Sequence, residues 1–576
     1  MGSGSVPVAH AAAFLVNSVA DLPDGGLADG LCDTGSAPFL TGICTLRAAI
    51  QQANATVGPD AITLPAGVYT LTRVGTGEDE ADTGDLDITD DMTIIGANAA
   101  TTIVDGLTFD RVFDILPGAT VTIQDVTIQN GDTASVIVVI VGGGVTGIGA
   151  GIRNMGTLTL TDVDVKDNAA DESAGGGIAN QGSLTMSGGT ISDNSARDAG
   201  GGIFNLDSGT ATLNNVTVSD NTVERRGGGI ATLGSLTLTD STVSGNTANR
   251  QGAGIFSGGG TLTLTTSTIR DNVLDAPGSF GGGIYNTGAL TMDQSTIRDN
   301  TARKGGGGLF HSSDASTATL TKSTISGNTL ALQGMGGGGI YNRGPMSLTN
   351  VTITGNQAPA GYGAAIRNNA GATLQVVNST IFNNVGINMI HNLGSATFKN
   401  TIVGGGTGTT TKSVVTSQGY NLESASSCGF TEPTDLVNTD PLLGPLQLNA
   451  PGNTETHALL VGSPAVDAGT CAGAPATDQR GVARPKGTTC DIGAFEDPVA
   501  AAIAAGCYNF DGDEAVDIDD VVAIASRWHL TAANPDPDGN PLTPNYELYF
   551  DLHPDDGIIT VQDIMLVSAQ WGQPCP

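Results

Sequence analysis

Oxygen-bearing side chains near the C-terminus are spaced as the ligands of one hard cation would be. Residues 509–520 place them at positions 1, 3, 5, 9 and 12 of a twelve-residue loop, and position 7 offers a backbone carbonyl. Calcium takes about six to eight such oxygen atoms. A second acidic loop follows at 551–563. The predicted calcium ligands are Asn509, Asp511, Asp513, Ala515, Asp517 and Asp520 in the first loop, and Asp551, His553, Asp555, Asp556 and Asp563 in the second.

Two Arg-Asp dipeptides offer a different chemistry. Arg270-Asp271 and Arg298-Asp299 occupy the same place in neighbouring sequence repeats. A guanidinium beside a carboxylate can hold a uronate and take part in proton abstraction, so these four residues are the candidate catalytic set. The same dipeptides also suit exposed turns in which each arginine pairs with its neighbour, and that interpretation remains the alternative.

The dipeptides belong to a long internal repeat that must position them. The string Ser-Thr-Ile-x-x-Asn, or a close variant, recurs every 25 to 28 residues. A Gly-rich run and then Ile-x-Asn follow each string, with Thr232, Ser257 and His311 replacing Asn in that column. The strings end at Asn168, Asn194, Asn221, Asn246, Asn272, Asn300, Asn328, Asn356 and Asn384.

Each repeat contains three short segments in which apolar residues alternate with Thr or Ser, as at Leu236–Leu238. Alternation with a period of two indicates strands, and no helical period is present. A single unit of this length cannot bury its apolar face, but stacked units share one core. The repeat therefore predicts an all-β fold, a right-handed parallel β-helix, whose Asn columns pass hydrogen bonds from coil to coil.

Residues 43–54 have helical spacing instead and are placed to cap the N-terminal end of the stack. The string Cys44–Asn54 resembles the Cys-Ser-Leu-Arg-Glu-Ala-Ile motif of bacterial secreted β-helix proteins, with Ala48 where Glu is usual. The repeats are similar to those of polymorphic outer-membrane proteins. These resemblances imply the fold and a destination at the cell surface, and they imply no particular activity.

The C-terminal part resembles two further families. Residues 440–496 are similar to the choice-of-anchor Q segment, through strings such as Thr456–Leu460 and Asp491–Glu496. The two acidic loops are each followed by an apolar helical pattern, and this loop-helix pair resembles a dockerin. The dockerin resemblance implies a small α-helical calcium-binding domain and a cohesin-like or cell-surface protein as its partner.

The seven cysteines flank the repeats and are absent within them. Their placement predicts disulfides at the ends of the domains, formed in an oxidising compartment. The expected pairs are Cys32–Cys44, Cys471–Cys490 and Cys507–Cys575, which leaves Cys428 over.

The composition of the chain excludes several classes of partner. The formal net charge is −35, which argues against nucleic acid and against an anionic membrane surface as partners. No apolar stretch approaches the length of a membrane span, so no membrane insertion is expected. Ala9-His10-Ala11 resembles the end of a signal-peptide cleavage site, which predicts a secreted or cell-surface protein.

We therefore expect a non-catalytic scaffold or adhesin with a calcium-dependent C-terminal attachment module. Because parallel β-helices include pectate-lyase-like enzymes, the alternative is a dockerin-tethered enzyme acting on an extracellular polysaccharide, as a lyase or a glycoside hydrolase. The expected domains are 1–59 (N-terminal segment and cap), 60–410 (coils), 411–497 (C-terminal coils and capping segment), 498–506 (linker) and 507–576 (paired calcium loops).

Overall fold

The computed structural model describes residues 11–35, 42–133, 140–141, 144–145, 148–312, 315–331, 335–412, 415–460 and 462–497. The predicted linker 498–506, every predicted calcium ligand, Cys507 and Cys575 lie outside these residues. The described chain divides into two compact units. The first holds residues up to 292, 296–318 and 328–341, and the second holds 293–295, 319–327 and 342–497.

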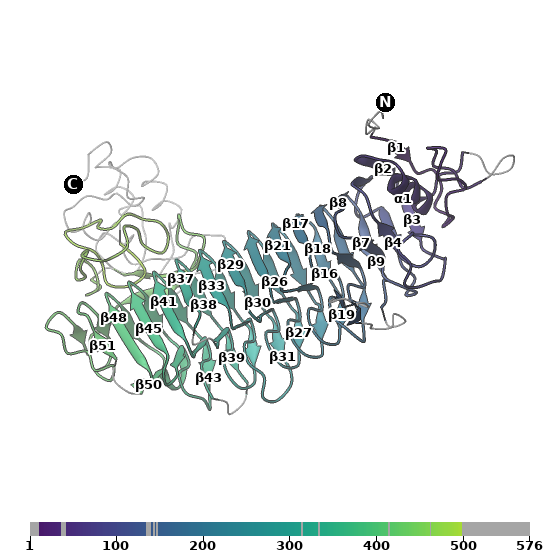
Figure 1. Cartoon of the computed structure of the whole chain (residues 1–576). Helices are drawn as coiled ribbons and strands as arrows, with labels where there is room; N and C mark the ends of the chain where they lie inside the picture. The colour runs from purple at the N-terminus through teal and green to yellow at the C-terminus, as the bar shows by residue number, and fades with distance from the viewer. Residues whose placement is uncertain are drawn as a thin grey trace, which may run out of the picture. The chain divides into compact units, whose positions relative to one another are not determined.

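In the first unit, successive coils stack their strands into three parallel sheets (Figure 1). Sheet A holds β1 (Ala13–Leu15), β2 (Asp60–Leu64), β5 (Met92–Gly96), β8 (Thr120–Gln124), β13 (Thr157–Thr161), β17 (Ser183–Ser187), β21 (Thr210–Asn214), β25 (Ser235–Thr239) and β29 (Thr261–Thr265). Sheet B holds β3 (Gly67–Thr70), β6 (Thr102–Asp105), β9 (Thr127–Gln129), β14 (Asp164–Lys166), β18 (Thr190–Ser192), β22 (Thr217–Ser219), β26 (Thr242–Ser244), β30 (Thr268–Arg270) and β34 (Thr296–Arg298).

Sheet C contains two strands from most coils, separated by a turn. The longer ones are β4 (Leu86–Ile88), β7 (Phe113–Ile115), β12 (Ile152–Asn154), β16 (Ile178–Asn180), β20 (Ile203–Asn205), β24 (Ile230–Thr232), β28 (Ile255–Ser257), β32 (Ile284–Asn286) and β36 (Leu309–His311). The shorter ones are β15 (Ala169–Ala170), β19 (Ser195–Ala196), β23 (Thr222–Val223), β27 (Thr247–Ala248), β31 (Val273–Leu274), β35 (Thr301–Ala302) and β39 (Thr329–Leu330).

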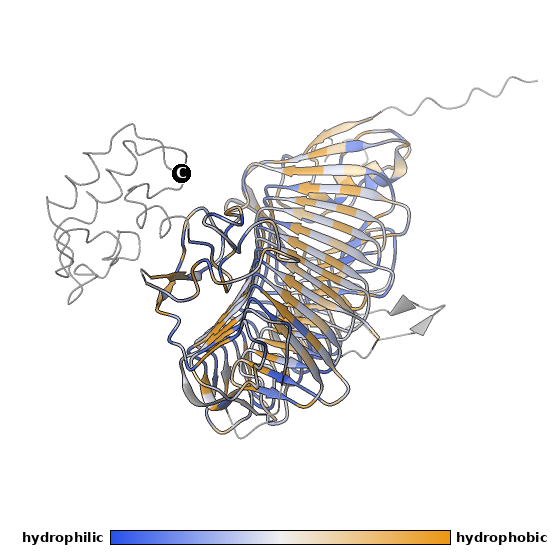
Figure 2. Cartoon of the chain, turned by 90° about the vertical axis from the view of Figure 1, so that its left-hand side faces the viewer, coloured by the Kyte–Doolittle hydropathy of each residue, from blue (hydrophilic) through white to orange (hydrophobic). Residues whose placement is uncertain are grey.

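The apolar residues of each coil lie directly over those of the next, as the repeating hydrophobic bands of Figure 2 show. Ile178 pairs with Ile203, and Leu236 pairs with Leu262, in both cases as buried residues. The alternating Thr and Ser residues face outward. The predicted parallel β-helix is therefore confirmed, and its core consists of stacked β-branched residues and leucines.

Buried asparagines connect the coils, as the sequence predicted. Between sheets B and C, the side-chain amide of each Asn donates to the Oδ1 atom of the next at 2.9–3.0 Å. This ladder runs through Asn168, Asn194, Asn221, Asn246, Asn272, Asn300 and Asn328. His311 is a substituted position of the second column, where its Nδ1 lies 3.0 Å from the amide of Asn286.

The residue before each ladder asparagine adopts a left-handed conformation. Asp167, Asp193, Asp220, Asp271 and Asp299 have φ values of 54–58°. Among non-glycine residues, Asp and Asn tolerate this region best, because the short polar side chain can bond locally. The repeated aspartates are therefore turn residues that bend the chain from sheet B into sheet C.

A short helix caps the N-terminal coil, close to the predicted range. Helix α1 (Leu46–Ala55) begins after Thr45, whose hydroxyl accepts the backbone N–H of Ala48. Arg47 is buried in it, pairs with Asp21 at 2.6 Å, and donates to the backbone carbonyls of Ala81, Gly84 and Asp85. The helix therefore covers the first coil and fixes the loop at 78–85. No helix of the described residues, α1 included, has the length and apolar character of a membrane span.

The second unit contains the last coils and the segment resembling choice-of-anchor Q. Its coil strands are β38 (Thr324–Ser326), β41 (Pro345–Thr349), β42 (Thr352–Thr354), β43 (Gln357–Ala358), β44 (Ile366–Asn368), β45 (Thr373–Val377), β46 (Thr380–Phe382), β47 (Val385–Asn392), β48 (Ser395–Lys399), β49 (Ile402–Gly404), β50 (Thr407–Lys412), β51 (Thr416–Ser417), β52 (Leu422–Glu423) and β53 (Leu436–Val437). An antiparallel pair, β54 (Leu443–Gln447) and β55 (Thr456–Leu459), follows.

The segment at 440–496 covers sheet B of these coils. Gln479 exchanges hydrogen bonds with the hydroxyls of Thr324 and Thr352, and the backbone N–H of Ala494 donates to Thr380. All three threonines are buried, whereas the equivalent threonines of β18, β22, β26, β30 and β34 in the first unit are partly exposed. Ile492 and Phe495 add an apolar cluster against Ile402 and Leu422. The resemblance gave no indication of this packing.

Two of the three predicted disulfides are present, Cys32–Cys44 and Cys471–Cys490. The third, Cys507–Cys575, lies outside the described residues. Cys428 is buried and takes part in neither observed disulfide. Its backbone N–H donates to the carboxylate of Glu423 at 3.0 Å, so the backbone of Cys428 takes part in the packing of this region.

Candidate functional site

The structure brings the four candidate catalytic residues together as an exposed row. Arg270 of β30 lies directly beside Arg298 of β34 on the outer face of sheet B. Each guanidinium pairs with its own neighbour, Asp271 or Asp299, at 2.6 and 2.7 Å, and all four side chains are about 40% exposed. Exposed ion pairs of this kind contribute little to stability. None of the four lines the grooves described below, so this geometry matches the turn interpretation.

A groove lies instead on the flank formed by the turns between the two strands of sheet C. It has a volume of about 840 Å³. Its lining residues come from three successive turns, after β23, β27 and β31. They are Glu224, Arg225, Arg226, Asn249, Arg250, Gln251, Asp275, Ala276, Pro277, Gly278 and Phe280, and together they define the arginine groove.

Backbone pairing from turn to turn holds the arginine groove in shape. Arg226, Gln251 and Phe280 occupy equivalent positions, joined by parallel bridges. The N–H of Arg250 donates to the carbonyl of Arg225 at 2.9 Å, and the N–H of Phe280 donates to the carbonyl of Arg250 at 3.2 Å. The side chains that line the groove therefore repeat at the coil spacing, about 4.8 Å.

The charges of the arginine groove are unevenly compensated. Arg225 pairs with Asp198 at 3.1 Å, and Asp275 pairs with Arg303, outside the groove, at 2.9 Å. Arg226 lies over the ring of Phe256, 5.2 Å from its centre. Arg250 is exposed, and within the described chain no carboxylate oxygen lies within 4.0 Å of its guanidinium. An exposed guanidinium of this kind is free to bind an anion bidentately.

A stack of aromatic rings continues from the arginine groove along sheet C. Phe256, Tyr285 and Phe310 pair in register, with ring centres 5.5 and 5.0 Å apart. Tyr341 follows at 4.9 Å, and Phe280 of the groove packs against Phe310 at 4.6 Å. Most of these rings are buried, since Phe256 and Phe310 are only 5% and 2% exposed. The stack therefore supports the turns of the groove, and Phe280 and Tyr285 are its partly exposed members.

A second groove of about 460 Å³ adjoins the first. The two share Glu224 and Asn249 as lining residues. The second one adds Asp171 and Arg197 from the two preceding turns, and Thr222 of β23. The sheet C flank of the first unit therefore offers a trough that crosses several coils.

Sequence reasoning did not find the arginine groove. Its arginines lie in turns whose composition varies from repeat to repeat, so they form no column in the sequence. The aromatic stack did leave a signal, because Phe256, Tyr285, Phe310 and Tyr341 all occupy the middle position of the Ile-x-Asn string or its relatives. The string was defined by its Ile and Asn positions, and the aromatic column lies between them.

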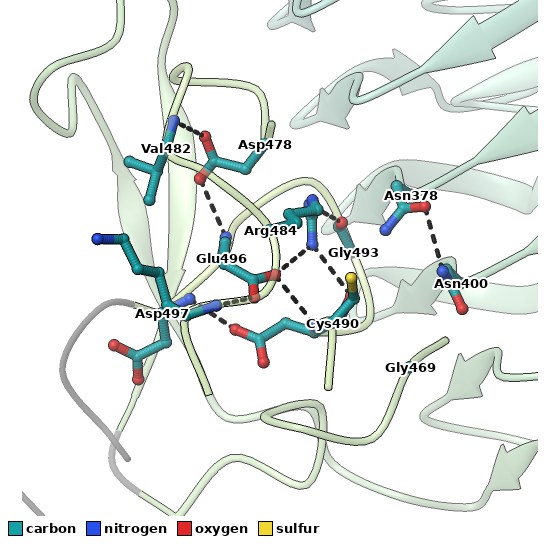
Figure 3. Close-up of polar contacts among 12 residues, drawn as sticks. Asn378, Asn400, Gly469, Asp478, Val482, Arg484, Cys490, Gly493, Glu496 and Asp497 are labelled. Atoms are coloured by element: carbon teal, nitrogen blue, oxygen red, sulfur yellow. Dashed lines mark hydrogen bonds and ion pairs between the residues drawn. The ribbon is translucent and has the colours of Figure 1, made fainter. Parts of the chain in front are cut away.

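The segment at 440–496 contains a buried charge cluster that resembles a catalytic centre in composition only (Figure 3). Arg484 pairs with Glu496 at 2.7 Å, and their side chains are 0% and 1% exposed. Glu496 also accepts backbone N–H groups of Lys486 and Asp491 at 2.9 and 3.0 Å. Burial raises the pKa of Asp491 to about 8, and the nearby Glu496 adds to the shift. The carboxylates of Glu496 and Asp491 accept hydrogen bonds from backbone N–H groups of the same segment. The cluster therefore stabilises the fold of the segment.

Comparison with known proteins agrees with this architecture. The model of the right handed beta helix region matches residues 112–297 and 234–405, which together cover just over half of the chain. The chain therefore belongs to the right-handed β-helix family. No curated protein matches it.

Solved structures with low similarity were also found. A pectate lyase shares 13% identity with a TM-score of 0.30, covering 84% of this chain and 96% of its own. The A-module of an Azotobacter vinelandii mannuronan C-5 epimerase shares 16% identity with a TM-score of 0.30, covering 68% and 94%. The catalytic domain of an α-1,3-glucanase in complex with nigerose shares 16% identity with a TM-score of 0.26, covering 65% and 67%.

Proposed function

We propose that this protein is a secreted or cell-surface β-helix that binds an acidic extracellular polysaccharide in the arginine groove. The observation that carries the proposal is the convergence of Arg225, Arg226 and Arg250 on one groove of a chain with a net charge of −35. A chain so acidic repels polyanions at long range. A polyanionic ligand must therefore be held by short-range contacts, and the three arginines of the groove can provide them. An extended uronic-acid polymer presents carboxylates in a line, as the successive turns present their side chains.

Arg250 decides whether the arginine groove binds uronates. Replacing Arg250 by Gln should weaken binding of polygalacturonate at least about tenfold, because a charge-assisted hydrogen bond contributes about 1.5–3 kcal/mol. Titration calorimetry with polygalacturonate, and with a neutral glucan of similar length, measures the change. Affinity for polygalacturonate should also fall as salt is raised.

Arg298→Gln is the matched control for this substitution, since it removes an exposed arginine from sheet B of the same unit. It should leave binding unchanged. Equal binding of the neutral glucan, or equal losses from the two substitutions, would contradict the proposal.

Catalysis on the bound polysaccharide is the second candidate function. Glu224, whose side chain is exposed, lines the arginine groove together with Arg225 and Arg250. Proton abstraction from a uronate needs a base with a positive charge nearby, which this set could supply. Analysis of the polysaccharide after the binding assay distinguishes binding alone from catalysis. Unsaturated chain ends, absent in the Glu224→Gln variant, would establish a lyase and replace the non-catalytic scaffold that we favour.

We also propose that residues 507–576 form a calcium-dependent attachment module, on the strength of the loop spacing and the dockerin resemblance. Both tryptophans of the chain, Trp528 and Trp571, belong to this segment. Chelation should therefore change tryptophan fluorescence while the β-sheet signal in circular dichroism persists, because metal binding and folding are coupled in small modules. Asp513→Ala should reproduce the effect of chelation. Fluorescence that does not respond to calcium would reject the module.

A further inference from the structure

We propose that the N-terminal end of the first unit contains a calcium site formed by Asp79, Asp87 and Asp114. These residues offer one carboxylate oxygen each, and the three oxygens lie within 4.8 Å of one another. The site is separate from the acidic loops after residue 507 and from the arginine groove. Calcium accepts carboxylate ligands in flexible geometry, and water can complete its coordination.

Sheet C places two of the three ligands. Asp87 is the central residue of β4 and Asp114 is the central residue of β7, and the two pair directly in register. Their side chains therefore project from the same face of neighbouring strands. Like charges directly opposite each other on a sheet are destabilising, which makes this pair costly unless something compensates it.

The third ligand comes from a loop that the capping helix holds. Arg47 and Gln51 of α1 donate to the carbonyl of Ala81, at 3.0 and 3.1 Å. The carboxylate of Glu78 accepts the N–H groups of Glu80 and Thr83 at 2.8 and 2.7 Å. Asp79, between these anchors, is exposed, so it closes the site from the solvent side.

One carboxylate oxygen of Asp87 has no hydrogen-bond partner. Asp87 is 0% exposed, and its Oδ2 accepts the N–H of Ala81 at 3.0 Å. Its Oδ1 is buried and makes no hydrogen bond. A buried charged oxygen without a donor is expensive, and a cation between Asp87, Asp79 and Asp114 would satisfy it.

The buried carboxylates around the site outnumber the guanidiniums that face them, and a divalent cation would balance the difference. Asp85, Asp87, Asp110 and Asp114 are all buried. Two guanidiniums face them: Arg111, 2.5 Å from Asp85 and 3.7 Å from Asp114, and Arg153, which binds both oxygens of Asp114. Each oxygen of Asp114 keeps a second lone pair for a metal.

Hydrogen exchange of the full-length chain tests the site and separates it from the C-terminal loops. The protein is stripped with a chelator, and deuterium uptake is followed by mass spectrometry with and without calcium chloride at about 1 mM, the range of extracellular calcium modules. Peptides covering 78–88 and 110–116 should exchange about tenfold more slowly with calcium. In Asp87→Asn this protection should disappear.

Asp60→Asn is the matched control, because Asp60 is also buried with one partnerless carboxylate oxygen but lies outside the three-residue group. It should keep the calcium response of 78–88. Should Asp87→Asn fail to fold, the exposed Asp79→Asn decides, and its calcium midpoint should rise at least about tenfold. A wild-type chain whose 78–88 peptide ignores calcium, or an Asp79→Asn chain that responds as the wild type does, would overturn the proposal.

Discussion

Replacing Asn246 by Ala is expected to lower the free energy of unfolding by about 3–5 kcal/mol, one of the two largest effects predicted for this protein. The side-chain amide donates to the carbonyls of Val218 and Ser244 and to Oδ1 of Asn272, at 2.9–3.0 Å. Its own Oδ1 accepts both the backbone and the side-chain N–H of Asn221 at 3.0 Å. Alanine removes all five bonds and leaves their buried partners without them.

Urea unfolding followed by circular dichroism measures the change. The matched control is Asn249→Ala, since Asn249 is an exposed asparagine three residues further along the same coil. Its substitution should change stability by less than about 0.5 kcal/mol. If the two variants unfold at the same urea concentration, the ladder contributes little, and the asparagines would be only favourable turn residues.

The coils were predictable because their determinants repeat. Ile178, Ile203 and Ile230 recur at one position of each unit, and the stacked registers follow directly from that recurrence. The ladder was predictable for the same reason, down to the substitution at His311. A stacked fold turns sequence period into spatial register, so any residue that recurs can be placed without knowledge of the rest of the chain.

Features that depend on non-recurring residues could not be predicted. Arg225 and Arg250 belong to turns of different composition, and backbone pairing between those turns brings them onto one flank. Asp79 reaches the pair Asp87 and Asp114 because α1 fixes its loop, a contact between segments with no shared pattern. The Arg-Asp dipeptides show the converse: they recur, and their recurrence reflects the turn that each aspartate makes.

The C-terminal segment gives rise to the second large effect. Replacing Arg484 by Met should destabilise the second unit by about 3–5 kcal/mol, because it leaves the buried carboxylate of Glu496 without its counter-charge. Arg484 also donates to the carbonyls of Asp491 and Gly493 at 3.1 and 2.8 Å, so the turn that carries Ile492 and Phe495 loses its anchor (Figure 3). Those two residues belong to the apolar cluster against the coils.

The pH dependence of the same cluster has a definite sign. The folded-state pKa of Asp491 is about 8, above its ordinary value of 3.8. The folded chain therefore keeps a proton that the unfolded chain releases, and stability falls as pH rises from about 4 to about 8. One such group changes the free energy of unfolding by at most about 1.4 kcal/mol per pH unit. Asp491→Asn should flatten the profile in that window.

Arg343→Met supplies the comparison for Arg484→Met, since Arg343 is an exposed arginine of the same unit. The Arg343→Met variant should have the same unfolding midpoint as the wild type. Limited proteolysis of Arg484→Met should cut the chain first within 440–496. The coils should then still unfold at their own temperature, because the ladder and the stacked isoleucines do not depend on the segment that covers sheet B. Simultaneous loss of coils and segment in Arg484→Met would instead show that the cluster at Arg484 and Glu496 holds the last coils themselves together.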